Sequence, residues 1–326
     1  VRNRDGKWYV LEDNLRVPSG VSYSLENRRV MEKLLPQLLK KLAIAPVDDY
    51  PQQFLKSLMN SAPEGVSDPN IVVLTPGKQS SAYFEHAYLA KKIGVPLIEV
   101  EDVVIEDGYL KMLTAEGLRR IDVIYRRGNK ELFNSLKVGQ NYPSGIAAIA
   151  NLCKQGKLAV ANAIGTGVAD DKVIYAYVPQ MIRYYLDEEP ILPNVPTYLC
   201  WQEEDRKYVL EHLDELVVKS ASEEGGQGML VGTMASSSER EEFAQKIKSQ
   251  PRSYLAQPTI YLSSIPTVFG DRLEERHTDL RPYIIHQGED IYVYPGGLTR
   301  VAMEKGNLVV NSTQGGGSKD TWVKMN

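Results

Sequence analysis

Between residues 71 and 161, short apolar runs alternate with stretches whose apolar residues have helical spacing. This pattern predicts strands at residues 71–74, 97–100, 121–125 and 158–161. It also predicts an amphipathic helix over 80–93, ending at Gly94, and a helix over 144–156. Strands separated by helices at such short intervals favour a parallel sheet covered by helices, because parallel strands need long crossover connections.

The flanking segments have a different texture. Residues 1–11 predict a hairpin around the Asp5-Gly6 turn, and residues 24–42 predict a helix interrupted at Pro36. Residues 60–69 are rich in Pro, Gly and Ser and resemble a linker. The C-terminal half predicts strands joined by Gly-rich turns, at residues 215–219, 229–232, 259–262, 281–286, 291–294, 299–302 and 307–311, and helices over 173–187 and 238–249. The fold class is therefore α/β followed by α+β.

Composition excludes several classes of protein. The chain has 326 residues, 43% of them hydrophobic, which is enough for more than one domain. A net charge of −4 without basic blocks argues against nucleic acid and anionic membranes as partners. Cys153 and Cys200 are the two cysteines, without a CxxC motif, so a disulfide scaffold or structural zinc site is not expected. These features indicate a cytoplasmic enzyme.

The N-terminal residues suggest that the sequence is part of a longer protein. The predicted strand before the Asp5-Gly6 turn already includes Val1, and the chain starts without Met or a signal-peptide pattern.

Two segments contain residues suited to binding phosphate. An apolar run, Leu216–Val218, ends in Lys219, and a glycine-rich turn at residues 225–228 follows six residues later. Glycines allow backbone N–H groups to approach an anion closely. Lys172 lies at the start of a predicted helix, where the helix dipole does not favour a cation. Each feature can also be explained as a surface lysine beside an ordinary turn.

Carboxylate, amide and guanidinium groups follow the first predicted hairpin. Glu12 and Asn14 are two residues apart, so on a strand their oxygens would face the same side and could share a hard cation such as Mg²⁺. Arg16 would lie on that side too. A polar strand end running into the Pro18–Gly20 turn is the alternative explanation.

Charged residues also lie at predicted strand ends near the C-terminus. Residues 276–281 precede a predicted apolar strand, and Arg300 follows a Gly-Gly turn. Arginine can bind a phosphate or carboxylate through two parallel hydrogen bonds. Solvated charged strand ends are the simpler alternative.

The order of these segments resembles the circularly permuted type 2 branch of the ATP-grasp superfamily, related to the synthetase domain of glutathionylspermidine synthase. The longest similar runs are VLEDNLRVPSGVSYSLENRRVM, SSAYFEHAYLA, NAIGTGVADDKVIYAYVPQMIRYYL and NSTQGGGSKDTWV. In most ATP-grasp enzymes a Glu-x-Asn-x-x-Pro-Gly motif closes the domain, whereas here the similar stretch from Glu12 to Gly20 comes first. Family members carry a further Asp, a third metal ligand, at a position just before Val1. Residues 128–143 fit the family poorly.

The resemblance implies three segments: a permuted ATP-grasp segment (1–60), a Rossmann-like pre-ATP-grasp domain (61–168) and an ATP-grasp nucleotide-binding domain (169–326). It implies ATP and Mg²⁺ as cofactors and the following roles. ATP would be bound by Lys172, Lys219, Gly225, Gly226, Gly228, Gln257 and Asp279. Glu12 and Asn14 would ligate Mg²⁺, and Arg281 and Arg300 would be catalytic. Acceptor-site candidates are Arg16, Ser19, Glu85, His86 and Arg126.

The implied reaction is ATP-dependent ligation of a carboxylate to an amine. ATP phosphorylates the carboxylate, and the amine attacks the acyl phosphate, with ADP and phosphate released. Small molecules or peptides would supply both groups. Two other classes fit parts of the pattern: a non-catalytic nucleotide or peptide binder, and a phosphotransferase that needs no amine. If the permuted arrangement is correct, residues 1–20 should lie beside residues 296–317, and strand 7–11 should pair with the strand near 307–311 or with its neighbour.

Overall fold

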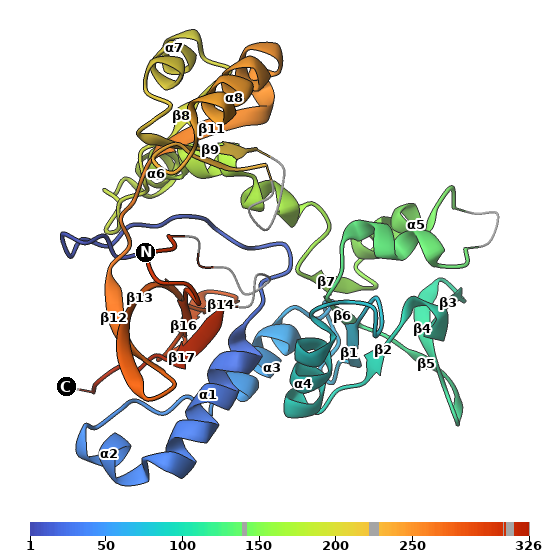
Figure 1. Cartoon of the computed structure of the whole chain (residues 1–326). Coiled ribbons are helices and arrows are strands. Elements are labelled where there is room, and N and C mark those ends of the chain that lie inside the picture. The colour runs from blue at the N-terminus through green and yellow to red at the C-terminus, as the bar shows by residue number, and fades with distance from the viewer. Residues whose placement is uncertain (139–141, 222–227, 309, 311–315, 326) are drawn as a thin grey trace. The chain divides into compact units, whose positions relative to one another are not determined.

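The computed structural model describes the chain except residues 139–141, 222–227, 309, 311–315 and 326 (Figure 1). The chain divides into two compact units. Unit 1 comprises residues 1–14, 167–280 and 300–317, and unit 2 comprises residues 15–166, 281–299 and 318–326. The predicted boundary at 168/169 lies two residues from the observed division at 166/167, while residues 15–60 belong to the same unit as 61–166. The three-domain division itself stays a prediction.

Unit 2 contains the parallel sheet that the alternating pattern predicts. Its order is β2 (Leu97–Ile98), β1 (Ile71–Leu74), β6 (Val123–Arg126) and β7 (Ala159–Ala161) (Figure 1). All three pairings are parallel. The four predicted strands are therefore confirmed: β1 has the predicted bounds, and the ends of the other three differ by at most two residues.

Alternate residues of β1 enter different hydrophobic clusters, so both faces of the sheet are covered. Ile71 and Val73 pack with α3 (Tyr50–Asn60) and α4 (Tyr83–Ile93). Val72 and Leu74 pack with α5 (Gly145–Lys154) and the antiparallel sheet β3 (Val103–Glu106), β4 (Tyr109–Thr114) and β5 (Gly117–Arg120). Coverage on both faces explains why these strands are continuously apolar. The Rossmann-like description remains a prediction.

The rest of unit 2 consists of helices and a hairpin. The predicted helix over 24–42 forms as α1 (Val21–Leu34) and α2 (Pro36–Lys41), broken where Pro36 cannot donate a backbone hydrogen bond. A two-stranded sheet, β14 (Ile284–Gln287) and β15 (Asp290–Val293), packs on α3. The sequence pattern did not predict α3.

Unit 1 contains an antiparallel sheet in the order β10 (Leu230–Val231), β9 (Leu216–Ser220), β11 (Tyr254–Pro258) and β8 (Tyr198–Leu199). One face packs against α7 (Glu203–Glu211) and α8 (Ser237–Ser249) through Val209, Ile247 and neighbouring side chains. A reciprocal pair of hydrogen bonds between Ser236 and Glu239 caps α8. Helix α6 (Lys172–Leu186) belongs to the same unit.

A further sheet has the order β12 (Ser264–Phe269), β13 (Arg272–Arg281), β16 (Leu298–Val301) and β17 (Gly317–Asp320). Residues 276–281 precede the apolar strand β14, as expected, but they also form the end of a strand themselves, β13. The expected strand at 259–262 was wrong, because only a single bridge at Leu262 forms there. The described residues of 307–311 form no strand, and residues 309 and 311 lie outside the described part of the chain. Short 3₁₀ helices cover Val100–Asp102, Lys130–Ser135, Thr166–Asp170 and Pro251–Ser253.

The N-terminal hairpin packs against residues from the other end of the sequence. Val1, Tyr9 and Leu11 share a hydrophobic cluster with Ala302 and Val310 within unit 1. This proximity is what the permuted arrangement predicts. Val10 forms a bridge with Asn194, and the expected pairing near 307–311 stays a prediction because residues 309 and 311 lie outside the described residues.

Candidate functional site

Strand β9 places Lys219 on the face of its sheet opposite α7 and α8. Side chains alternate along a strand, so Leu216 and Val218 face the helices while Lys219 points to the other side. Its Nζ donates to Gln257 Oε1 at 2.7 Å, and Gln257 Nε2 donates to Thr197 Oγ1 at 3.0 Å. The ammonium thus donates to a neutral amide oxygen, and Thr197 in turn fixes that amide.

Burial lowers the pKa of Lys219 to about 8. The Glu12 carboxylate raises the pKa and Lys172 lowers it, which places both charges within electrostatic reach of Lys219. A buried ammonium without a paired carboxylate is costly. An anionic ligand would therefore bind to a cation that is already desolvated.

Glu12 and Asn14 lie close together in a segment of unit 1 that is not part of a strand. Asn14 Nδ2 donates to Glu12 Oε1 at 3.4 Å. Burial, followed by the charges of Glu12 and Asp170, raises the pKa of the intervening Asp13. Within the described residues, no group of three or more His, Cys, Asp or Glu side chains is arranged to hold a metal ion.

This donor set fits Mg²⁺ only together with a phosphate ligand. Mg²⁺ is commonly held by one or two carboxylates, with phosphate and water oxygens completing its octahedron. Glu12 and Asn14 supply a carboxylate and an amide oxygen, and Lys219, whose pKa the Glu12 carboxylate raises, is suited to binding the phosphate.

Lys172 and three glycines are further residues of unit 1 that the sequence suggests for nucleotide binding. Lys172 is the first residue of α6, directly after Asp171, whose carboxylate caps the helix by accepting from Val173 N at 2.8 Å. Gly228 has a left-handed φ of 66°, which glycine adopts at low cost, whereas Gly225 and Gly226 lie outside the described residues.

Asp279 and Arg300 form a bidentate ion pair across β13 and β16. Arg300 Nε lies 2.8 Å from Asp279 Oδ1, and Nη2 lies 2.6 Å from Oδ2. The carboxylate is buried and fixes the plane of the guanidinium. Asp279 is therefore suited to positioning Arg300.

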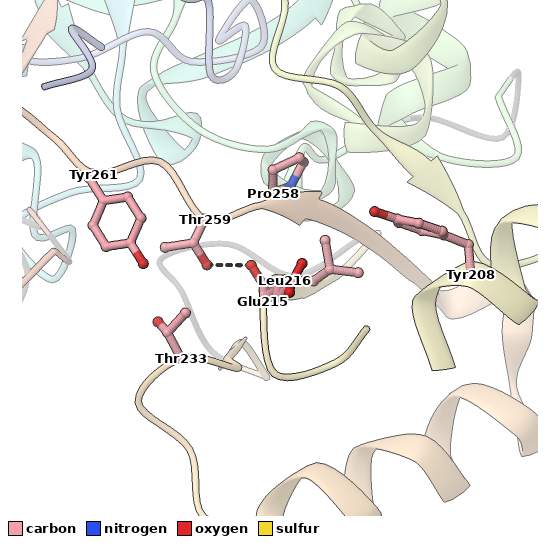
Figure 2. A pocket seen from close by; sticks show the side chains of 7 residues that line it. All are labelled: Tyr208, Glu215, Leu216, Thr233, Pro258, Thr259 and Tyr261. Atoms are coloured by element: carbon pink, nitrogen blue, oxygen red, sulfur yellow. Dashed lines mark hydrogen bonds between the residues drawn. The ribbon is translucent and has the colours of Figure 1, made fainter. Parts of the chain in front are cut away.

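A pocket in unit 1 lies on the helix side of the same sheet (Figure 2). Leu216 and Pro258, which are register partners, line it together with Tyr208, Glu215 and other residues. Because Leu216 and Lys219 face opposite sides of β9, this pocket is separate from the lysine cluster.

Unit 2 contains a buried ion pair between Arg127 and Glu85. Arg127 Nη2 donates to Glu85 Oε1 at 2.7 Å, and their side chains are 0% and 1% exposed. The other oxygen, Oε2, accepts from Gly20 N at 2.7 Å and from Ser22 N and Oγ at 3.1 and 2.8 Å. Glu85 therefore caps the N-terminus of α1.

Side chains from other parts of unit 2 bind four backbone polar groups of the loop of residues 16–20. Asn162 Nδ2 donates to Arg16 O at 3.3 Å, and Arg127 donates to Pro18 O. Arg281 Nη1 donates to Ser19 O at 2.9 Å. These contacts fix the positions of Arg16 and Ser19 within unit 2. They also show that Glu85 and Arg281, which we expected to bind substrates, bind the protein's own backbone.

Arg126 and His86 also form hydrogen bonds within unit 2. Arg126 donates to the carbonyl oxygens of Asn162 and Ala163 at 3.2 and 3.3 Å. His86 is fully buried, with Nδ1 2.8 Å from Thr75 Oγ1, and its Nε2 has no hydrogen-bond partner among the described residues. Burial, and then the charge of Arg127, lowers the pKa of His86 to about 4.

This pKa predicts a pH dependence of stability. The unfolded chain takes up a proton near pH 6.5 while folded His86 does so near 4, so stability is full above 6.5 and falls as pH decreases to 4. We expect up to about 3 kcal/mol to be lost from this group. Denaturant unfolding at pH 7 and 4.5 should show a smaller decrease for His86→Gln than for the parent. The exposed His286→Gln should keep the parent's decrease, and an equal decrease in all three proteins would contradict the prediction.

Sequence reasoning did not assign roles to Asn162 and Thr197, and it treated Arg127, like Arg126, as a residue that could face the acceptor. The arginine pair directly after an apolar strand was a usable signal, since charges at the carboxyl end of a parallel strand lie where loops meet. No comparable signal marks Thr197.

Residues 1–302 match the family described as circularly permuted ATP-grasp type 2. The chain belongs to this family. A relative of uncharacterised function from Synechocystis sp. is 59% identical over 323 residues, covering 99% of this chain and 67% of the relative. A Mycobacterium tuberculosis relative is 47% identical, and the alignment covers 99% of this chain and 59% of that protein. The chain thus spans about three fifths to two thirds of the length of these relatives.

A Frankia casuarinae protein, named as a candidate glutamate–cysteine ligase, is 43% identical over 99% of this chain but only 37% of its own length. Among solved structures, a glutathione synthetase-like effector from Globodera pallida matches with a TM-score of 0.58 at 8% identity, covering 99% of this chain and 73% of that one. This similarity confirms an ATP-grasp-type mixed fold. The family is one of ATP-using ligases.

None of the described helices is long and apolar enough to cross a membrane.

Proposed function

We propose that this chain catalyses the ATP-dependent joining of a carboxylate to an amine, through an acyl phosphate. The observation that carries the proposal is the desolvated Lys219, fixed by Gln257 and within electrostatic reach of Glu12 and Lys172. Family membership supports it, because an ATP-grasp ligase needs a preformed cation for the nucleotide phosphates. The name of the Frankia relative also describes the joining of a carboxylate to an amine.

Each residue set has a proposed role. Lys172 and Lys219 hold ATP phosphates, and Gln257 fixes the Lys219 ammonium. Arg300, oriented by Asp279, stabilises negative charge on the transferred phosphoryl group. Mg²⁺ at Glu12 and Asn14 would neutralise phosphate charge when bound.

The chemistry requires two steps. An oxygen of the substrate carboxylate attacks the γ-phosphorus, and the bond from that phosphorus to the bridging oxygen of ADP breaks. The amine nitrogen then attacks the acyl carbon, phosphate leaves, and the amine loses a proton. We assign the acceptor side to the 16–20 loop, with Arg16 and Ser19 contacting substrate. Glu85, Arg126, Arg127 and Arg281 act as positioning residues for this loop and its neighbours. His86 is neutral at pH 7 and is also assigned to the acceptor side.

Lys219→Ala tests the nucleotide assignment. Loss of one charge-assisted contact costs about 1.5–3 kcal/mol, so we expect at least about tenfold weaker binding of a non-hydrolysable ATP analogue, measured by calorimetry. Lys207→Ala changes an exposed lysine on α7, and this variant should bind the analogue like the parent. Unchanged binding in Lys219→Ala would disprove the assignment.

The pKa of Lys219 predicts that the affinity for the ATP analogue depends on pH. With a pKa of about 8, Lys219 loses its charge as pH rises from 7 to 9, so the affinity of the parent for the analogue should fall over that range. Lys219→Arg stays charged and should show a weaker dependence.

ADP release with and without candidate amines distinguishes the reaction classes. A ligase releases ADP and forms an amide when an amine is supplied. A phosphotransferase releases ADP without any amine and leaves a stable phosphorylated product. A binder takes up the ATP analogue but releases no ADP.

A further inference from the structure

A second hollow lies in unit 2 at the amino-terminal edge of the parallel sheet. It has a volume of about 370 Å³, within the range of small-molecule sites. Its apolar part is formed by Leu55 and Met59 of α3, Ile71 of β1, Ile93 of α4 and Met112 of β4. Methionine side chains adapt readily to the shape of an apolar ligand.

Two opposite charges line this hollow without being paired to each other. Asp68 and Arg119 are both exposed, and neither side chain has a hydrogen bond or ion pair in the part of the chain that the structure describes. The neighbouring Arg120 contrasts with Arg119, because its Nε lies 2.8 Å from Asp122 Oδ1. An apolar hollow with an unpaired cation and an unpaired anion fits a ligand that carries both charges.

The surroundings of the two charges are fixed. Asn70 follows the Asp68-Pro69 segment directly, and its N–H donates to Asp122 Oδ2 at 2.9 Å. Arg119 lies on β5 in register with Met112, whose side chain forms part of the hollow. Helix α4 ends at the hollow with Gly94, and the carbonyl groups of a helix C-terminus favour a positive group. That preference adds to the attraction of Asp68 for an ammonium.

We propose that this hollow binds a zwitterion with an apolar side chain, that is, an apolar α-amino acid. Its carboxylate would bind Arg119, its ammonium would bind Asp68, and its side chain would contact Met59 and Met112. In parallel sheets the reacting ligands bind at the carboxyl ends of the strands, where Thr75 and Arg127 follow β1 and β6. The hollow is at the opposite ends of these strands, so the bound amino acid is an additional ligand. This inference does not depend on the proposed ligase activity.

Methyl NMR of the methionine-labelled protein tests the site directly. The chain has eight methionines, of which Met59 and Met112 line the hollow. Titration with L-leucine or L-phenylalanine, without ATP, should shift the Met59 and Met112 signals saturably at millimolar concentrations. Met234 and Met303, which belong to unit 1, should not shift. Absence of saturable shifts, or shifts confined to unit 1, would overturn the proposal.

Charge-deleted probes and variants separate zwitterion binding from simple apolar binding. Leucinamide lacks the carboxylate and N-acetyl-leucine lacks the ammonium, and each should bind about two- to fivefold more weakly than leucine, because both contacts are at exposed charges. Arg119→Gln and Asp68→Asn should each weaken leucine binding comparably. Lys91→Gln and Glu64→Gln change exposed charges outside the hollow and should bind like the parent. Equal binding of all three probes, or parent-like binding by Arg119→Gln or Asp68→Asn, would exclude the proposed site.

Discussion

Replacing Glu12 by Gln is expected to abolish ADP formation in the full-length protein and to leave the melting temperature nearly unchanged. The substitution keeps the shape of the side chain and removes the charge that a divalent cation needs. Glu12 is exposed, and its hydrogen bond among the described residues is the long contact with Asn14, so we expect the fold to lose little. A coupled assay for ADP and a thermal melt on the same preparation measure both effects.

A matched control variant for Glu12→Gln is available, and two outcomes would contradict the prediction. Glu211→Gln removes an exposed carboxylate at the end of α7 and should retain full activity. Full activity in Glu12→Gln would rule out Glu12 as a metal ligand and would favour the non-catalytic binder. A large decrease in melting temperature would instead show a structural role for Glu12.

Arg127→Met is expected to destabilise unit 2 by about 3–5 kcal/mol, since removing one partner leaves the other charge buried and uncompensated. Here that partner is Glu85, which is 1% exposed and also caps α1. The double variant Arg127→Met/Glu85→Gln should be less destabilised than the sum of the two single variants, because no charge then stays buried.

The tryptophans allow unit 2 to be monitored alone. Trp322 belongs to unit 2, whereas Trp8 and Trp201 belong to unit 1. In a Trp8→Phe/Trp201→Phe background, the fluorescence of Trp322 during urea unfolding reports on unit 2. Arg29→Met, which breaks an exposed ion pair with Glu26 on α1, should cost at most about 1 kcal/mol. An equally small effect of Arg127→Met would show that the buried pair contributes little.

The sequence predicts those parts of the fold in which local pattern and tertiary burial agree. Strand β1 is continuously apolar because helices cover both of its faces, and α4 ends at Gly94, which adopts a left-handed φ of 74°. Strand β13 was missed because most of its residues are charged or polar. Its identity as a strand depends on pairing with β12, which local periodicity does not reveal.

Site residues show the same difference. Lys219 was predicted to lie at the end of a strand because the preceding run is apolar, and it does so in β9. Glu12 and Asn14 were predicted to face one side of a strand, whereas they lie close together in a segment that forms no strand. The contacts of Glu85 were not predictable, since its partners Gly20 and Arg127 are 65 and 42 residues away in sequence. A buried capping carboxylate and a substrate-binding carboxylate have the same sequence signature.

The way in which the chain alternates between the two units has a consequence for biosynthesis. The chain passes from one unit to the other at five junctions, between residues 14 and 318. Val1 and Tyr9 reach their partners Ala302 and Val310 only after about 300 intervening residues have left the ribosome. The parallel sheet of unit 2, by contrast, is complete once Ala161 has emerged. We therefore expect this sheet to form during translation before residues 302–310, the packing partners of the hairpin at residues 1–11, have been synthesised.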